Sequence, residues 1–457
     1  MLFHTWPFFL FLLVVLAVYL ALRRTRLAVW WLFVASYFFY GWWNPLYLLL
    51  IFYSTLVDYF AVIMMDRGRH KELWLWVSLV SNLSLLVFFK YSGFVTDNLN
   101  SLLTAAGVGI QLDAPDVLLP VGISFFTFQS MSYTIDFYRG KIPRERSFIR
   151  FATFVAFFPQ LVAGPIERAK ALLPQLAIHP RVTREDITDG LSLFLVGLFK
   201  KIALANYLAL YVDQVYLIPD QYSAPALMLA TFAFAWQIYF DFSGYTDMAR
   251  GVARMMGYRL MLNFNNPYLA TGLTDFWSRW HISLSTWFRD YVYIPLGGNR
   301  HGGRIMYRNL FLTFVISGVW HGAGWNFVVW GLLHAIGTVI THAGERSVWY
   351  AELPRFLKQL LVFVFVCFTW IFFRAESLGD AWLIVNRIGS SGWQDPAFPL
   401  LALLLVSSVW LYQFLHESRF QRLLSSSVVQ VALAVLMILY LCISPGAASQ
   451  PFIYFQF

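Results

Sequence analysis

Two histidines, each beside a tryptophan, lie in one stretch of an otherwise apolar sequence. His281 falls in TDFWSRWHISLSTWFRDYVYIPLGGNRHGGR, and His321 falls in SGVWHGAGWNFVVWGLLHA. Ionisable side chains are expensive at membrane depth and usually mark a working site. Burial disfavours the charged form of an imidazole, which suits a neutral general base. These two histidines are therefore the candidate catalytic residues, with His321 ranked first.

The residues around His281 predict an amphipathic helix. Thr274 or Asp275 can cap a helix that begins at Phe276. Aromatic side chains then recur at steps of three and four on one face. A second face carries Ser278, His281, Ser285 and Arg289. We expect this helix to lie at a membrane interface or to line a cavity rather than to span.

The glycine-rich loop GGNRHGGR follows this helix and adds Arg300 and Arg304. A basic, glycine-rich loop can hold the phosphates of a nucleotide-like ligand. An ordinary positively charged cytoplasmic loop explains the same residues equally well. The candidate residues for binding a phosphate-bearing donor are Arg279, Arg289, Arg300 and Arg304, with Ser285 nearby.

Glycines flank His321 on both sides, so other helices or a substrate can approach it closely. As one helix, residues 309–341 would be about 50 Å long at 1.5 Å per residue, whereas a bilayer core is about 30 Å thick. We therefore expect a break or a tilt near these glycines, with Trp320 and Asn326 shaping the pocket. His334, on the same run, has no glycine setting and ranks lower.

Other chemistry finds little support in the sequence. There is no HExxH, P-loop or GxSxG motif, and a zinc site at the two histidines lacks carboxylate companions. We expect no metal. Cys367 and Cys442 both lie in apolar runs, which argues against a disulfide or a cysteine metal site.

Composition places the chain in a membrane. It has 457 residues, of which 59% are hydrophobic and only 12% charged, against about 25% charged residues in soluble domains. Since no long hydrophilic stretch could form a separate domain, we expect one membrane domain over residues 1–457. The net charge of +9 is typical of basic cytoplasmic loops rather than of nucleic-acid binding.

The apolar runs predict an all-α, polytopic protein with roughly eleven membrane helices. Arg23, Arg139 and Arg300 should face the cytoplasm, and Asn44 and Asp213 the outside, because basic clusters follow alternate runs. The predicted runs are 3–22, 27–40, 46–65, 73–89, 117–137, 187–211, 226–240, 309–341, 360–373, 400–415 and 428–443.

Two further segments break this simple pattern. Residues 151–170 are apolar but interrupted by Pro159, Gly164 and Pro165, which predicts a re-entrant segment. Lys200 and Lys201 lie inside a strong span. The charged residues Asp241, Asp247, Arg250 and Arg254 form either an ion-paired helix end or the wall of a polar cavity.

At these residues the chain resembles the membrane-bound O-acyltransferase (MBOAT) superfamily, and within it the bacterial branch of alginate O-acetylation proteins. The two histidine segments are the specific signatures. VGISFFTFQSMSYTIDFYRG, FVAFFPQLVAGPIER, YFDFSGYTDMARG and the terminal FIYFQF also look like that branch. The resemblance covers essentially the whole chain.

The resemblance implies one multi-helix fold around a central funnel or tunnel in a bacterial inner membrane. It carries the family's catalytic histidine onto His321 and its second signature position onto His281. It implies acetyl-CoA as the donor, with no tightly bound cofactor. The acceptor would be an exopolysaccharide such as alginate, or a periplasmic partner protein that completes the transfer. A transporter and a non-catalytic scaffold of a secretion complex remain the alternatives, motivated by Asp136, Lys200 and Lys201.

Overall fold

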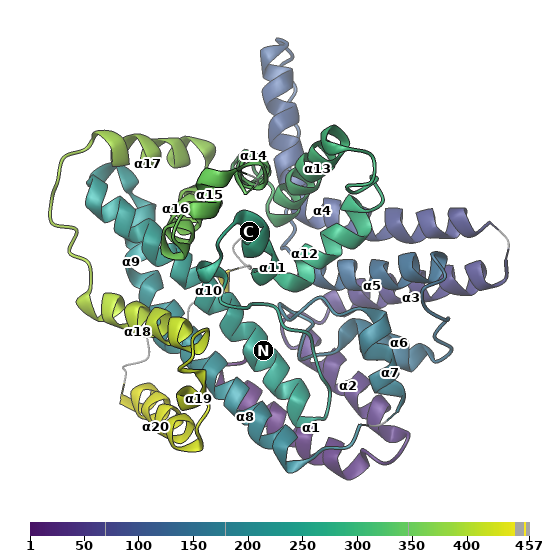
Figure 1. Cartoon of the computed structure of the whole chain (residues 1–457). Helices are drawn as coiled ribbons and strands as arrows, with labels where there is room; N and C mark the ends of the chain where they lie inside the picture. Colours follow the sequence, from purple (N-terminus) through teal and green to yellow (C-terminus); the bar gives the residue numbers. More distant parts are fainter. Residues whose placement is uncertain (69, 179, 346, 444–451, 454–457) are drawn as a thin grey trace. The chain divides into compact units, whose positions relative to one another are not determined.

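The structure is a computed structural model that describes residues 1–68, 70–178, 180–345, 347–443 and 452–453 (Figure 1). The chain divides into two compact units. Unit 1 comprises Met1–Phe194 and Met248–Met261, and unit 2 comprises Leu195–Asp247 and Leu262–Phe457. The single membrane domain expected over the whole chain stays a prediction. Of the terminal FIYFQF motif, all but its first two residues lie outside the described part.

The described residues are helical and contain no strand, which confirms the all-α class. Six of their helices are long and apolar enough to cross a membrane: α3 (Tyr47–Asp66), α4 (Lys71–Ala105), the continuous helix Arg184–Leu217, α10 (Ala224–Met255), α14 (Trp325–Gly344) and α16 (Arg355–Arg374). Shorter apolar helices also coincide with predicted runs: α1 (Trp6–Leu22), α2 (Leu27–Gly41), α18 (Leu400–His416) and α20 (Ser427–Ile443). The total of roughly eleven membrane helices stays a prediction.

The remaining elements are shorter. Unit 1 adds α5 (Ile123–Tyr138), α6 (Phe148–Ala156), α7 (Ala169–Ala177) and the greater part of α8 (Arg184–Phe199). Unit 2 adds the π-helix η1 (Lys200–Ala205), α9 (Asn206–Leu217), η2 (Pro219–Gln221), η3 (Pro267–Leu269), α11 (Leu273–Arg279), α12 (Ile282–Phe288), the π-helix η4 (Arg289–Tyr293), α13 (Gly303–His321), α15 (Val348–Glu352), α17 (Leu378–Ser390) and α19 (Gln421–Leu424).

Helix α4 is longer than the sequence predicted. The predicted apolar run ends near residue 89, but the helix continues to Ala105. Nothing in the polar stretch after the apolar run forces a stop, since the chain first reaches a positive φ at Gly107. Hydropathy marks where a helix can be buried, not where it ends.

Polar side chains inside unit 1 satisfy one another. The Asp58 carboxylate is buried on α3. It accepts hydrogen bonds from the Ser78 hydroxyl at 2.5 Å and the Asn82 amide at 2.9 Å, both on α4, and from the Ser130 hydroxyl on α5. A buried carboxylate without such donors would be strongly destabilising. This cluster therefore fixes the register of three helices.

The segment predicted to be re-entrant has the structure expected of one. Helices α6 and α7 have nine residues each, which gives about 13 Å at 1.5 Å per residue, too short to span. Irregular backbone joins them, and every residue from 151 to 167 is buried. Non-helical backbone at membrane depth is tolerated where protein surrounds it, and protein surrounds these residues. Their depth in a membrane stays a prediction.

The intramembrane lysines lie on the π-helix η1, and each has a carboxylate partner on α10. The Lys201 ammonium lies 2.7 Å from Asp241, and the Lys200 ammonium lies 2.7 Å from Asp247. Gly244, between these two aspartates, lets α10 approach closely, because a Cβ there would lie 2.8 Å from the Gly197 carbonyl oxygen. The charged residues of α10 thus form ion pairs, as one of the two sequence interpretations held.

Helices α13 and α14 form a tight hairpin whose helices lie side by side (Figure 1). The predicted break is confirmed: α13 ends at His321, and α14 begins at Trp325. A Cβ on Gly318 would lie 2.3 Å from the Phe327 carbonyl oxygen, and a Cβ on Gly331 would lie 2.5 Å from that of Phe314. The contact therefore requires residues without side chains.

We predict that Gly331→Ala lowers the thermal unfolding temperature in detergent, measured by tryptophan fluorescence. Overpacking a tight contact costs about 1–3 kcal/mol, which exceeds the gain of roughly 1 kcal/mol in helix propensity. Gly344→Ala, at the end of the same helix, is the matched control. Its Cβ would meet only Tyr350, at 4.0 Å, so its unfolding temperature should hold or rise. Equal effects of the two substitutions would contradict the close-contact account.

Candidate active site

The helix expected around His281 is broken at that residue. Helix α11 begins at Leu273 rather than Phe276, with Gly272 at the N-cap, so neither Thr274 nor Asp275 caps it. His281 then adopts a left-handed conformation with φ 43° and ψ 54°, and α12 starts after it. The prediction of one continuous amphipathic helix was wrong, because backbone hydrogen bonds from elsewhere in the chain hold this break.

Those bonds come from residues 263–265. The Asn265 amide donates to the Arg279 carbonyl at 2.9 Å, and the Ile282 amide donates to the Asn263 carbonyl at 2.9 Å. Non-glycine residues in the left-handed region are uncommon and persist only where the surroundings hold them. Here the two bonds flank His281 and hold its backbone from both sides.

The His281 side chain is fully buried and is bound through Nδ1. The Asn263 side-chain oxygen lies 3.0 Å from His281 Nδ1, and it accepts from the Ser283 backbone amide at 3.2 Å and the Ser283 hydroxyl at 3.0 Å. Because a backbone amide can only donate, the Asn263 atom that faces it must be oxygen. Nδ1 must therefore carry the imidazole proton, and Nε2 is the acceptor nitrogen of the ring.

Burial lowers the pKa of His281 to about 3. The cause is desolvation by burial. The described groups that contact the ring include the neutral side chains of Asn263, Ser283, Phe242, Phe264 and Trp320. An imidazole in this setting is neutral at any ordinary pH. The burial and neutrality expected from the sequence are therefore present at His281.

His321 closes α13 inside a shell of aromatic rings. It is 3% exposed. The rings of Trp320 and Trp330 contact it edge to face, each with its centroid 4.9 Å away, and Phe373 does so at 5.3 Å. The Trp320 centroid also lies 6.5 Å from that of His281. The two signature histidines thus share one wall, which is Trp320.

His334 has the features of a structural histidine. It is fully buried, and its Nε2 lies 3.0 Å from the Thr369 hydroxyl oxygen. That hydroxyl donates its own proton to the Val366 carbonyl at 2.8 Å. His334 must therefore donate from Nε2, and it is the opposite tautomer to His281. Five aromatic rings surround it: Phe276, Trp277, Phe314, Trp330 and Phe365.

The predicted pocket residues have defined places around the histidines. Trp320 is the shared wall. Asn326 is 5% exposed at the start of α14, and its amide donates to the Ala375 carbonyl at 3.0 Å. The Ser285 hydroxyl donates to the Trp280 carbonyl at 3.1 Å. Ser285 thus holds local backbone, and Asn326 ties the start of α14 to the end of α16. Asn263, which the sequence did not single out, contacts a catalytic candidate directly.

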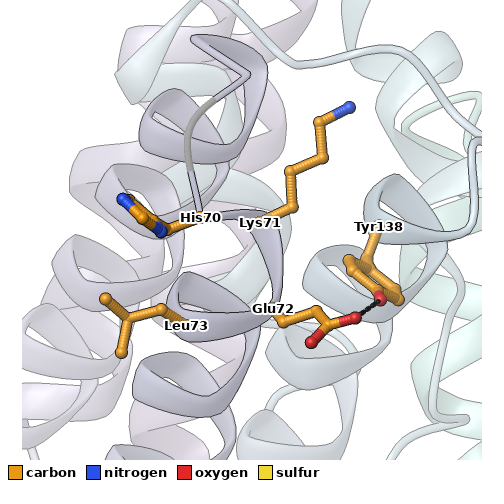
Figure 2. Close-up of a pocket in the computed structure, with 5 residues that line it drawn as sticks. All are labelled: His70, Lys71, Glu72, Leu73 and Tyr138. Atoms are coloured by element: carbon orange, nitrogen blue, oxygen red, sulfur yellow. Dashed lines mark hydrogen bonds between the residues drawn. The ribbon is translucent and has the colours of Figure 1, made fainter.

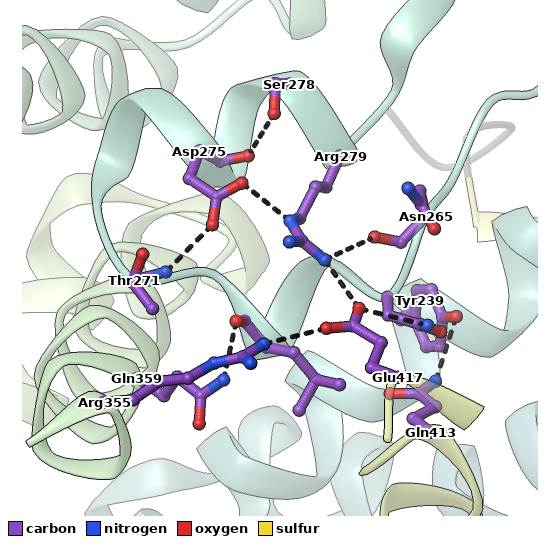
Figure 3. A network of polar contacts seen from close by, with 12 residues as sticks. Tyr239, Asn265, Thr271, Asp275, Ser278, Arg279, Arg355, Gln359, Gln413 and Glu417 are labelled. Carbon is purple, nitrogen blue, oxygen red and sulfur yellow. Dashed lines mark hydrogen bonds and ion pairs between the residues drawn. The ribbon is translucent and has the colours of Figure 1, made fainter. Parts of the chain in front are cut away.

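Arg279 is part of an ion-pair network, which Figure 3 shows. Its guanidinium lies 2.7 Å from Asp275 and 2.7 Å from Glu417. Glu417 also lies 3.0 Å from Arg355. Two carboxylates thus compensate the charge of Arg279, which ties α11 to the end of α18 and leaves little of that charge for a phosphate.

The other predicted arginines are exposed. Arg289 pairs only with its neighbour Asp290, at 2.9 Å. Arg300 is exposed on the loop before α13 and Arg304 is exposed in the first turn of α13, and neither pairs with a carboxylate of the described chain. Buried Asn309 closes this loop by donating to the Gly298 carbonyl at 3.0 Å, and Gly297, Gly298 and Gly302 have positive φ angles. Of the four predicted arginines, Arg279 is thus paired with two carboxylates, and the other three are exposed at the surface.

A hollow in unit 1 contains neither signature histidine. Figure 2 shows its lining: His70, Lys71, Glu72 and Leu73 at the start of α4, with Tyr138 at the end of α5. The Tyr138 hydroxyl donates to Glu72 at 3.5 Å. All five side chains are exposed. Nor do the described residues bring three or more His, Cys, Asp or Glu side chains together as a metal site.

Two buried histidines thus lie against Trp320: His281 at the break between α11 and α12, and His321 at the glycine-flanked end of α13. Residues 138–378 match the family model of MBOAT, the membrane-bound O-acyltransferase family, and the chain belongs to this family. It is therefore a multi-pass membrane O-acyltransferase. This family assignment favours an enzyme over the transporter and scaffold alternatives.

Particular relatives narrow the class. The chain is 42% identical to the probable alginate O-acetylase AlgI of Pseudomonas aeruginosa, over 84% of this chain and 74% of that protein. It is 37% identical to the peptidoglycan O-acetyltransferase of Helicobacter pylori, over 79% and 74%. It is 30% identical to the teichoic acid D-alanyltransferase of Bacillus subtilis, over 56% and 69%.

We predict that Arg279→Gln lowers the thermal stability of the detergent-solubilised protein. Hydrogen bonds to charged groups contribute about 1.5–3 kcal/mol, and the substitution leaves two carboxylates without their shared cation. Arg289→Gln is the control, because exposed ion pairs contribute roughly 0–1 kcal/mol. If Arg279→Gln left the unfolding temperature at the wild-type value, the network would have no structural role and Arg279 would return to the donor site.

Proposed function

We propose that this protein transfers an acetyl group from acetyl-CoA on the cytoplasmic side to a hydroxyl of an exopolysaccharide such as alginate. The names of the relatives AlgI and peptidoglycan O-acetyltransferase support acetyl as the group and a polysaccharide as the acceptor. A periplasmic partner protein that receives the acetyl group on a serine would serve as an intermediate acceptor of the same chemistry.

The observation that carries this proposal is the shared wall of the two histidines. His281 and His321 come from different helices, yet both rings lie against Trp320, and both residues fall inside the segment that matches the O-acyltransferase family. A pair of buried imidazoles supplies what acyl transfer requires, namely a proton acceptor and an oriented partner group.

The proposed reaction needs neither a metal nor a redox group. His321 removes the proton of the acceptor hydroxyl, whose oxygen attacks the thioester carbonyl carbon. The carbon–sulfur bond breaks, and the leaving thiolate takes the proton from the imidazole, so the products are an acetyl ester and coenzyme A. In the alternative route, an imidazole nitrogen of His321 attacks the thioester carbonyl carbon and coenzyme A leaves. The acceptor hydroxyl then attacks the acetyl-imidazole, which releases the acetyl ester and restores His321.

The exposed arginines are the proposed entrance for the donor. Arg300 and Arg304 lie beside the N-terminus of α13, which adds a partial positive charge to theirs. Arg289 lies on the preceding helical segment. The donor binds there as a co-substrate and leaves, so we propose no resident cofactor. Arg279 belongs to this set only through its place in the sequence, since its charge is compensated.

Acetyl transfer from one face of a membrane to the other requires a passage. We propose that the helices, roughly eleven of them membrane helices, enclose a funnel or tunnel through the bacterial inner membrane, with the histidines along it. Arg23, Arg139 and Arg300 would face the cytoplasm, and Asn44 and Asp213 the periplasm, in agreement with the positive-inside rule. Trp320, Asn326 and Ser285 would shape the path near the histidines.

We predict that His321→Ala abolishes acetyl transfer while the protein still inserts and accumulates. Loss of a general base lowers turnover by about 10²- to 10⁴-fold. The measurement is incorporation of labelled acetyl into the polysaccharide or the partner protein, by purified protein in proteoliposomes. His342→Ala is the control, since His342 lies in the last turn of α14, outside the Trp320 shell. Near-normal transfer by His321→Ala would exclude both the base and the carrier roles.

We predict that replacing Arg300 and Arg304 with alanine raises the donor concentration for half-maximal rate and largely preserves the maximal rate. Each exposed phosphate contact contributes on the order of 1 kcal/mol, so two contacts together change the half-saturation about tenfold or more. The double substitution of Arg419 and Arg422, two exposed arginines elsewhere in unit 2, removes the same charge and controls for long-range effects. A collapse of turnover with unchanged half-saturation would place the loop at the reaction centre instead.

A further inference from the structure

The side chain that holds His281 was not predicted from the sequence. Asn263 lies in irregular backbone between α10 and η3, is 0% exposed, and offers one oxygen to three donors. Two of those donors belong to Ser283, immediately after the break, and the third is His281 Nδ1. Asn263 therefore contacts both sides of the turn that presents the imidazole.

We infer that Asn263 is a positioning residue that fixes His281 as the Nδ1–H tautomer, so that Nε2 accepts a hydrogen bond from a hydroxyl of the acyl acceptor. This inference rests on the proposed function and goes beyond it, because it assigns the chemical class of the group that His281 meets. A group that binds to Nε2 must be a proton donor. A carbonyl or thioester oxygen offers no proton and therefore does not fit this position.

A hydroxyl fits this requirement better than a thiol, because S–H is a weak donor. The burial of His281 agrees with a binding role. With its pKa lowered to about 3, full transfer of a proton to this ring is unfavourable, whereas accepting a hydrogen bond is not. His281 thus holds a hydroxyl in place, and removal of the proton falls to His321.

The hydrogen bonds around Asn263 favour the Nδ1–H tautomer of His281 over the Nε2–H tautomer. A flipped Asn263 amide would set its NH2 group against the Ser283 amide proton, and a proton on His281 Nε2 would leave Nδ1 as a second acceptor facing the Asn263 oxygen. Each arrangement loses at least one hydrogen bond inside a buried site, which is unfavourable. Orienting partners of this kind usually contribute 10- to 100-fold to the function of the histidine that they hold.

The first test reads the tautomer directly, without donor or acceptor. Protein labelled with 15N-histidine is examined by NMR in detergent, and the His281 signals are those absent from His281→Asn. We expect that Nδ1 carries the proton and that Nε2 is unprotonated. His334 is the internal reference, since its bond to Thr369 requires the opposite tautomer. A His281 signal with protonated Nε2 would overturn the inference whatever the protein catalyses.

The second test uses two substitutions of Asn263. Asn263→Asp keeps an oxygen that accepts from Nδ1–H, and we expect the wild-type tautomer and an acceptor KM within about threefold of the wild-type value. Asn263→Leu removes the acceptor, and we expect mixed tautomers and an acceptor KM about 10- to 100-fold higher, with the donor KM unchanged. Gln359→Leu is the control, because it removes a buried amide of unit 2 that bonds only the Leu269 carbonyl.

The possible outcomes distinguish a failure of the Asn263 inference from a failure of the proposed function. If Asn263→Leu transfers acetyl with a wild-type acceptor KM, Asn263 is structural only and the inference is wrong. If Asn263→Leu fails to fold, Asn263→Asp and the tautomer of the wild-type protein still decide the matter. If the wild-type protein shows the expected tautomer but transfers no acyl group, the proposed function fails while the hydrogen-bond assignment stands.

Discussion

The hydrogen bonds that Asn263 accepts are the constraint on which the candidate active site depends. One side-chain oxygen of Asn263 accepts from the left-handed residue His281 and from Ser283 after it, while the Asn263 backbone carbonyl accepts from Ile282. In a buried site each of these donors would otherwise be left without an acceptor, at a cost of about 1–3 kcal/mol each. The backbone break and the orientation of the imidazole are therefore one feature. Neither can change without the other.

His321 is positioned differently, by the close packing of α13 against α14. Small residues at Gly318 and Gly331 allow α13 and α14 to pack backbone to backbone, which sets where α13 ends and hence where its last residue lies. Aromatic rings then fill the space around the imidazole. In hydrocarbon-like surroundings, helices gain little from hydrophobic burial against one another, so close packing through small residues carries the association. The glycines thus place the histidine, and the aromatic shell excludes charged and strongly hydrated groups from it.

The sequence predicted most of the helices and both histidines, because apolar runs, glycine breaks and ionisable residues in apolar surroundings are local signals. It did not predict the break at His281, since no glycine or proline lies between Leu273 and Ile294 to mark it. The bond that holds the break joins residues 18 positions apart. Likewise, the sequence suggested Arg279 as a phosphate ligand, because nothing local points to its partner Glu417, which lies 138 positions away. Partners distant in sequence carry no periodic signal.

The buried polar groups of this protein are stabilised in two ways. One way is found at groups that hold helices together, and the other at a candidate catalytic residue. Lys201 forms an ion pair with Asp241 at 2.7 Å, and the Asp58 carboxyl group accepts hydrogen bonds from three neutral side chains. These contacts hold helices together. His281 needs no opposite charge, because burial keeps its imidazole neutral. A neutral ring in an apolar shell can accept a hydrogen bond at little electrostatic cost, yet it disfavours the imidazolium. In the proposed reaction, a proton taken up near this site would therefore move on to the leaving thiolate rather than rest on the His281 ring, which would couple deprotonation of the hydroxyl to departure of the sulfur.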